Sequence, residues 1–133
     1  MEVFIDTTFE AAHKLPEVVP GHKCCRLHGH SFFVRCTFSG RTQEPEGWLT
    51  DFDELKLLVQ TEIHGPLDHN YLNDVRGLEN PTSENLAKWV WRAIQSARKG
   101  APSSVKEGIF PPLTEVMVRE SCTTGIVYRG DEE

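Results

Sequence analysis

The fold is decided by two stretches of sequence, VFIDTTFEAAHK at residues 3–14 and HGHSFFVRCTFS at residues 28–39. Both are rich in β-branched and aromatic residues and contain no proline, a composition typical of β-strands. The loop at 15–27 between them contains two prolines and a glycine. Since alternate strand residues share a face, the two expected apolar faces are Val3, Ile5, Thr7, Phe9, Ala11 and His13, and His28, His30, Phe32, Val34, Cys36 and Phe38.

Two amphipathic helices are predicted after these strands. Asp51 and Glu54 have the spacing of a capping box, and Gly65-Pro66 is expected to end the first helix. The second helix is expected to begin at residues 81–84 (PTSE) and to stop at 100–102 (GAP). Residues at helical spacing predict the buried stripes, Phe52, Leu55, Leu58, Val59 and Ile63 in the first helix and Leu86, Trp89, Val90, Ala93, Ile94 and Ala97 in the second.

A final pair of strands is predicted near residues 115–119 and 126–128, after a glycine- and proline-rich segment at 98–112 that we expect to be a mobile loop. The element order is therefore ββααββ. This order predicts an α+β fold, a four-stranded antiparallel sheet with two helices on one face. A chain of 133 residues fits one domain, so we expect a single domain over residues 1–133.

Charge and hydropathy exclude several classes of protein. The chain has 14 Lys and Arg against 20 Asp and Glu, a net charge of −6, which argues against a nucleic-acid or anionic-membrane surface. No apolar run has the length of a membrane span, and the N-terminus has no signal-peptide pattern. We therefore expect a cytoplasmic protein whose partner is a small molecule.

The four cysteines do not form the pattern of a disulfide framework. Cys24 and Cys25 are adjacent, and a pair of neighbouring residues makes a strained disulfide. Cys36 and Cys122 are expected to be ordinary buried apolar residues. In a reducing compartment, cysteines close to histidines indicate metal or nucleophile chemistry instead.

The clearest chemical signal is CCRLHGH at residues 24–30. His28 and His30 project to the same side of a strand, and antiparallel pairing across the 15–27 loop would bring His13 opposite them. Three imidazoles leave the fourth position of a tetrahedral metal open, as in catalytic zinc sites. Two other interpretations stay open: a strand start that binds no ligand, and a closed structural site completed by Cys24.

Two further groups could take part in chemistry. In Asp68-His69, the carboxylate can orient the imidazole and tune its proton affinity. Glu120 shares the strand face of Val116 and Val118, and a carboxylate on a packed face needs a partner. It could accept hydrogen bonds from the N–H edge of a pterin or guanine, or it could simply reach solvent. His64 is interpreted as a cation favoured at a helix C-terminus.

Five motifs occur in an order that resembles a known family: FEAAH at 9–13, Cys-x₃-His-Gly-His at 24–30, LDH at 67–69, NPTSE at 80–84 and ESCT at 120–123. Together they resemble the 6-pyruvoyltetrahydropterin synthase superfamily, and more narrowly its 6-carboxy-5,6,7,8-tetrahydropterin synthase branch. The resemblance covers residues 4–130.

The resemblance implies a tunnelling fold assembled as a homohexamer of two trimers, with active sites between subunits. It also implies a zinc-dependent lyase of queuosine (7-deazaguanine) biosynthesis. Such an enzyme converts 7,8-dihydroneopterin triphosphate to 6-carboxy-5,6,7,8-tetrahydropterin, acetaldehyde and triphosphate.

By position, the resemblance makes Cys24 the catalytic cysteine, Asp68 and His69 the acid–histidine pair, and Glu120 the pterin-anchoring carboxylate of the proton relay. The implied zinc ligands are His13, His28 and His30. Cys25 stands where the family commonly has glycine. One alternative is a 6-pyruvoyltetrahydropterin synthase, which eliminates triphosphate and is expected to have a longer gap between the cysteine and the His-Gly-His motif. The other is a non-catalytic, zinc-stabilised ring that binds a purine or pterin.

Overall fold

The protein is described by a computed structural model, which covers residues 1–99 and 110–132. Its elements in chain order are β1 (Glu2–His13), η1 (Lys23–Cys25), β2 (His28–Ser39), α1 (Phe52–Val59), η2 (Gln60–His64), α2 (Gly65–Leu67), β3 (Asn70–Tyr71), η3 (Leu72–Asp74), α3 (Ser83–Lys99), β4 (Leu113–Arg119) and β5 (Ile126–Tyr128). None of the helices in these ranges combines the length and apolar character that a membrane crossing requires.

The sheet has five strands in the order β3-β1-β2-β4-β5. β1 pairs with β2, β2 with β4 and β4 with β5, all antiparallel, as the sequence predicts. The expected strand count of four is wrong by one, because Asn70 and Tyr71 form a short strand parallel to β1 at Ala11 and Ala12. Two residues carry no period-2 pattern, so β3 could not be recognised from the sequence. The α+β class is confirmed.

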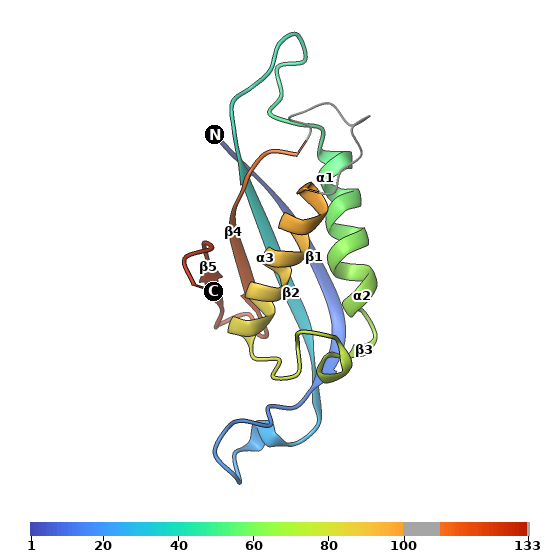
Figure 1. Ribbon diagram of the computed structural model, residues 1–133, viewed down its shortest axis with the longest axis vertical. Coiled ribbons are helices and arrows are strands. Elements are labelled where there is room, and N and C mark those ends of the chain that lie inside the picture. The colour runs from blue at the N-terminus through green and yellow to red at the C-terminus, as the bar shows by residue number, and fades with distance from the viewer. Residues whose placement is uncertain (100–109, 133) are drawn as a thin grey trace.

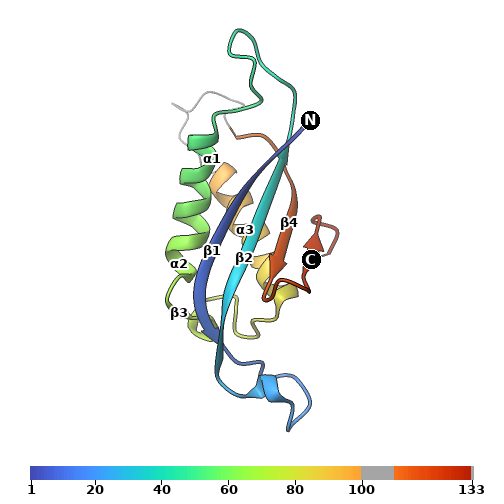
Figure 2. The same ribbon diagram turned by 180° about the vertical axis from the view of Figure 1, so that it is seen from behind.

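Both helices lie on one face of the sheet, and Figure 1 shows α1 and α3 side by side across β1, β2 and β4. Apolar residues of both helices and of the inner strand faces form one buried core. Phe9 and Phe32 stack at its centre with ring centroids 5.3 Å apart. The opposite face is seen in Figure 2, and no helix of the described residues lies over it. There Arg35 donates to both carboxylate oxygens of Asp6 at 2.7 and 2.9 Å and lies over the ring of Phe4.

Side chains cap both helix N-termini, and the cap by Asp51 is the one that the sequence predicts. Asp51 accepts a hydrogen bond from the Asp53 backbone N–H at 2.9 Å, and Thr82 accepts one from the Asn85 N–H at 3.1 Å. Such caps satisfy backbone donors that the helix itself leaves free. The predicted buried stripe of α1 holds for Leu55, Leu58, Val59 and Ile63, whereas Phe52 is 54% exposed.

The first helix does not end at Gly65-Pro66. It continues through the π turn η2 into α2, and Asp68 is its first extended residue. A proline inside a helix removes one N–H donor and clashes with the preceding turn. Here the wider π turn, with Gly65 N–H bonded to the carbonyl of Gln60, directly precedes Pro66, so the helix tolerates the ring for one more turn.

Two smaller expectations have different outcomes. Cys36 is fully buried, and burial raises the pKa of its thiol to about 12, but Cys122 is exposed, in the turn between β4 and β5. The predicted mobile loop at 98–112 falls mostly outside the described residues, although Arg98 and Lys99 still belong to α3.

Burial predicts unequal effects for two leucine truncations. Leu86 of α3 is fully buried, and Leu86→Ala should lower the free energy of unfolding by about 2–5 kcal/mol. Leu57 of α1 is 63% exposed, and Leu57→Ala should change it by less than about 0.5 kcal/mol. Urea unfolding at equal protein concentration measures both. Equal losses would contradict the assigned inner face of α3.

Candidate metal centre and active site

Three imidazoles converge at one end of the sheet, as the strand faces predict. His13 is the register partner of His28, and Ala11 is the partner of His30. The ring centroids lie 4.6 Å (His13–His28), 5.1 Å (His13–His30) and 4.9 Å (His28–His30) apart. One ring nitrogen from each residue lies within 4.8 Å of the other two. All three rings are on the helix-covered face. The ring of Phe32, on the core side of the cluster, packs against His13 and His30.

Backbone carbonyls orient two of these rings. His13 Nδ1 lies 2.9 Å from the carbonyl oxygen of Pro81, and His28 Nδ1 lies 2.7 Å from that of Arg26. A carbonyl only accepts, so each Nδ1 carries the hydrogen and each Nε2 keeps its lone pair. This is the usual arrangement for a metal-ligating histidine, whose second nitrogen donates to a backbone or carboxylate oxygen.

The free nitrogens fit a metal ion. His13 Nε2 and His30 Nε2 are buried and have no hydrogen-bond partner within the described ranges. Buried polar atoms without partners are rare and costly, and a cation between the rings would satisfy both. Burial lowers the pKa of His13, against smaller opposing effects of the Pro81 carbonyl and the Glu120 carboxylate. His13 is therefore neutral near pH 7, the form that binds metals.

Glu120 lies directly against this cluster. It follows the last residue of β4 and continues the inward face of Val116 and Val118, as its position in the sequence predicts. Its carboxylate oxygens lie 3.9 Å from His13 Nε2 and 3.7 Å from His30 Nε2. The side chain is 29% exposed, so the carboxylate is accessible to a ligand that approaches the imidazoles.

The two adjacent cysteines face different surroundings. The Cys24 carbonyl accepts from the Leu15 N–H at 2.7 Å, which holds this residue beside the chain just beyond His13. His22 Nδ1 accepts from the Cys24 N–H at 3.1 Å, so His22 caps its own turn. The Cys25 thiol points to the carbonyl of Val19 at 3.7 Å. Among the described residues, the metal-type cluster comprises the three histidines without Cys24, which does not support the closed site.

Asp68 and His69 are anchored to the outer edge of β1. Asp68 Oδ1 accepts from the Glu10 N–H at 3.0 Å, and Asp68 Oδ2 accepts from His69 Nδ1 at 2.8 Å. The His69 N–H donates to the Glu10 carbonyl at 2.6 Å. His69 has a φ of +56°, a left-handed conformation that costs free energy for a residue other than glycine. The hydrogen bonds to β1 hold this strained turn in place.

The surroundings of Asp68 stabilise its charge. The Glu10 N–H, and after it the hydrogen bond from His69, lower the pKa of Asp68 below its usual range. A charged Asp68 holds the hydrogen of His69 on Nδ1, so Nε2 is the nitrogen left for a reactant. The His69 side chain is 79% exposed.

The sequence interpretation missed His64 as a neighbour of Asp68. His64 Nε2 lies 3.8 Å from Asp68 Oδ2, and Gln60 Nε2 donates to His64 Nδ1 at 2.9 Å. The signal was available, because residues four apart on a helix are neighbours. The sequence interpretation instead explained His64 as a cation favoured by the helix dipole at a C-terminus.

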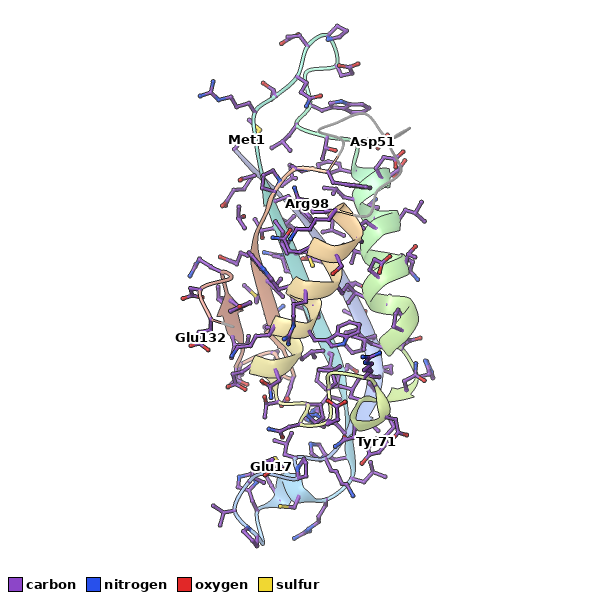
Figure 3. The ribbon with its side chains drawn as sticks, in the orientation of Figure 1. Met1, Glu17, Asp51, Tyr71, Arg98 and Glu132 are labelled. Carbon is purple, nitrogen blue, oxygen red and sulfur yellow. The ribbon has the colours of Figure 1, made fainter. Side chains whose placement is uncertain are left out.

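The two groups of candidate residues occupy the same end of the sheet, the imidazoles on its helix-covered face and Asp68 and His69 at the outer edge of β1. Figure 1 shows that β1 ends, β2 and α3 begin and β3 lies at this end, and Figure 3 labels Tyr71 there. An open pocket of about 540 Å³ is lined by Glu10, His30, Ser31, His69 and Tyr71, among others. Within the described part of the chain, Asp68 and His69 contact each other, His64 and β1 rather than the imidazole cluster.

Comparison with known proteins identifies relatives over nearly the whole chain. The family described as 6-pyruvoyl tetrahydropterin synthase matches residues 2–131. The chain is 38% identical over 130 residues to 6-carboxy-5,6,7,8-tetrahydropterin synthase of Synechocystis sp., covering 95% of this chain and 91% of that protein. It is 33% identical to the protein of the same name from Bacillus subtilis, covering 93% and 82% of the two chains.

A solved structure shows the same architecture. The 6-pyruvoyl tetrahydropterin synthase of Caenorhabditis elegans superposes with a TM-score of 0.81 at 23% identity, over 98% of this chain and 96% of that one. This similarity confirms the predicted tunnelling fold.

The orphaned imidazole nitrogens predict metal binding. The metal-free chain should bind one Co²⁺ per chain with the visible spectrum of a tetrahedral site, and His28→Ala or His30→Ala should weaken binding by at least about 100-fold. His22→Ala is the matched control, because His22 caps η1 and lies outside the cluster. Unchanged Co²⁺ affinity in both cluster variants would rule out the site.

The lowered pKa of Asp68 predicts a pH-dependent loss of stability. A carboxylate whose pKa is lowered by folding stabilises the folded state above its unfolded pKa, and this contribution disappears as the pH falls through the folded value. Asp68→Asn should therefore be less stable than the wild type near pH 7 and equally stable well below about pH 4. Urea midpoints across this range measure the difference. A constant difference would show that the charge of Asp68 contributes nothing.

Proposed function

Since the chain belongs to the 6-pyruvoyl tetrahydropterin synthase family, we propose that it converts 7,8-dihydroneopterin triphosphate to 6-carboxy-5,6,7,8-tetrahydropterin, acetaldehyde and triphosphate. The observation that carries this proposal is the cluster of three imidazoles beside Glu120, two of them with buried, unpaired Nε2 atoms, in a chain 38% identical to a 6-carboxy-5,6,7,8-tetrahydropterin synthase. As the sequence motifs suggest, we assign the reaction to queuosine biosynthesis in the cytoplasm.

Glu120 is the proposed anchor for the pterin ring. The guanidine-like edge of a pterin presents adjacent N–H donors, which match the two oxygens of a carboxylate. Glu120 is partly buried between the end of β4 and the histidines, where a bound ring would replace the water around it. A pterin whose guanidine-like edge is bound to Glu120 would place its three-carbon side chain near the imidazole cluster.

The proposed metal is Zn²⁺, held by His13, His28 and His30. When bound, Zn²⁺ supplies a Lewis acid that polarises hydroxyl and carbonyl oxygens and acidifies the neighbouring C–H bonds. The residues present fit it, because three imidazoles are a typical ligand set for a catalytic zinc. The carbonyls of Pro81 and Arg26 support the proposal by fixing two of the rings.

Proton transfer is assigned to Cys24 and His69. Cys24 is partly exposed and held beside the chain segment that follows His13, and as a thiolate it can accept a proton. His69 can donate or accept a proton at its exposed Nε2, while Asp68 keeps the hydrogen on Nδ1. The loss of a two-carbon aldehyde from a three-carbon side chain requires protons to be both removed and returned, which suits two groups.

The exposed position of His69 and the free edge of β1 favour an assembly of several chains. His69 is 79% exposed and is held at the outer edge of β1, and its own hydrogen bonds go to Asp68 and β1 rather than to the imidazoles. Within the described ranges, β3 covers this edge only at Ala11 and Ala12, so most of β1 offers a free strand edge. We propose a homohexamer of two trimers, in which His69 of one chain serves the metal site of a neighbour.

The released products test the function. Zinc-loaded protein incubated with 7,8-dihydroneopterin triphosphate should release acetaldehyde and triphosphate in equal amounts and form 6-carboxytetrahydropterin by mass spectrometry. A 6-pyruvoyl product without acetaldehyde would establish the alternative synthase. Chelation should abolish turnover but leave the circular dichroism spectrum near native, whereas a structural zinc would be needed for folding.

The adjacent thiols give a matched pair of variants. Cys24→Ala should lower kcat by about 10²-fold or more, as expected for a group that transfers a proton. Cys25→Ala should keep most of the activity, because the Cys25 thiol points to the Val19 carbonyl. The opposite ranking of the two variants would transfer the catalytic role to Cys25.

A further inference from the structure

A second histidine lies on the carboxylate that holds His69. His64 is the last residue of the π turn η2, four residues before Asp68. Its Nε2 lies 3.8 Å from Asp68 Oδ2, the oxygen that also accepts from His69 Nδ1 at 2.8 Å. The other oxygen, Oδ1, accepts from the Glu10 N–H. Two imidazoles therefore share a single carboxylate oxygen.

The orientation of His64 is fixed by its own helix. The side-chain amide of Gln60 donates to His64 Nδ1 at 2.9 Å. Since Nδ1 accepts, a neutral His64 carries its hydrogen on Nε2, the atom that faces Asp68. The position in the last turns before the helix ends at Leu67 also favours a positive charge on this imidazole.

Among the described residues, the other titratable groups beside this cluster are Tyr71 and His30, which line the same open pocket as His69, and Glu10 of β1. The turn η2 packs against β1 and α3. β1 brings Glu10, whose carboxylate accepts from the Ser31 hydroxyl at 2.7 and 2.8 Å. α3 contributes apolar residues such as Leu86 and Val90 to the shared core. His64, Asp68 and His69 are thus the titratable groups that contact one another here.

We infer that His64 is a positioning residue that sets, through the shared oxygen of Asp68, the pH range over which His69 carries a proton. With His64 neutral, the full charge of Asp68 supports a proton on His69. Once His64 is protonated, its positive charge competes for the same oxygen and repels a second proton. The two imidazoles therefore titrate as a coupled pair.

Only the effect of His64 on catalysis rests on the proposed function; the coupling between His64 and His69 does not. If His69 transfers a proton to or from the pterin, a protonated His64 keeps part of His69 in its neutral form in mildly acidic solution. The coupling itself is a property of the chain without substrate, and it can be measured without turnover.

The reactivity of His69 towards diethyl pyrocarbonate tests the coupling, because the reagent modifies neutral imidazole only. His69 modification is followed by fragment-ion mass spectrometry at about pH 6, where histidines are partly protonated, and at about pH 8, where they are neutral. The ratio of the two rates cancels differences in accessibility. The variants are His64→Gln, which removes the charge, and His64→Lys, which makes it permanent; both residues are good helix formers.

His64→Gln should lower the ratio of the rate at about pH 6 to that at about pH 8 by about twofold or more, because His69 then binds its proton more readily. His64→Lys should raise this ratio, and His22→Gln should leave it unchanged, since His22 only caps η1. An unchanged ratio in both His64 variants, or a change of the same sign in both, would overturn the inference. Either result leaves the product assay of the proposed function unaffected.

Discussion

The antiparallel pairing of β1 with β2 is the constraint on which the rest of the structure depends. Its register places His13 opposite His28 and Phe9 opposite Phe32. A strand has a period of two, so a slip of one residue would turn every inward side chain outward. The apolar core and the imidazole cluster therefore depend on the same register, and the many buried contacts of the core hold the three histidines together at the end of the strands.

The imidazole cluster is an extension of this core rather than a feature of a loop. Glu120 reaches the histidines because β4 continues its inward alternation past its last residue. Pro81 supplies a carbonyl to His13 from the turn that caps α3. The N-terminal turn of α3, which packs on the inner face, thereby also orients the His13 imidazole. Rigid elements position the cluster well, because their packing fixes the side chains before any ligand binds.

The Asp68 cluster is built on a different principle. Backbone groups of Glu10 hold Asp68 and the strained turn of His69 against the open edge of β1. This arrangement leaves the imidazole of His69 largely exposed and gives it hydrogen bonds separate from those of the imidazole cluster. This exposed position suits our proposal of a reaction centre shared between chains, in which the imidazole cluster and the acid–histidine pair come from different copies.

The sequence by itself determined the strand faces, the helix stripes and caps, the convergence of His13, His28 and His30, and the inward position of Glu120. All of these follow from local periodicity, which packing preserves because one face of each element must be buried. The parallel strand at Asn70 and Tyr71, the continuation of the first helix past Gly65-Pro66 and the exposure of Cys122 were settled by the tertiary structure alone. These features depend on contacts between distant segments or on a π turn, for which no periodic pattern in the chain provides a signal.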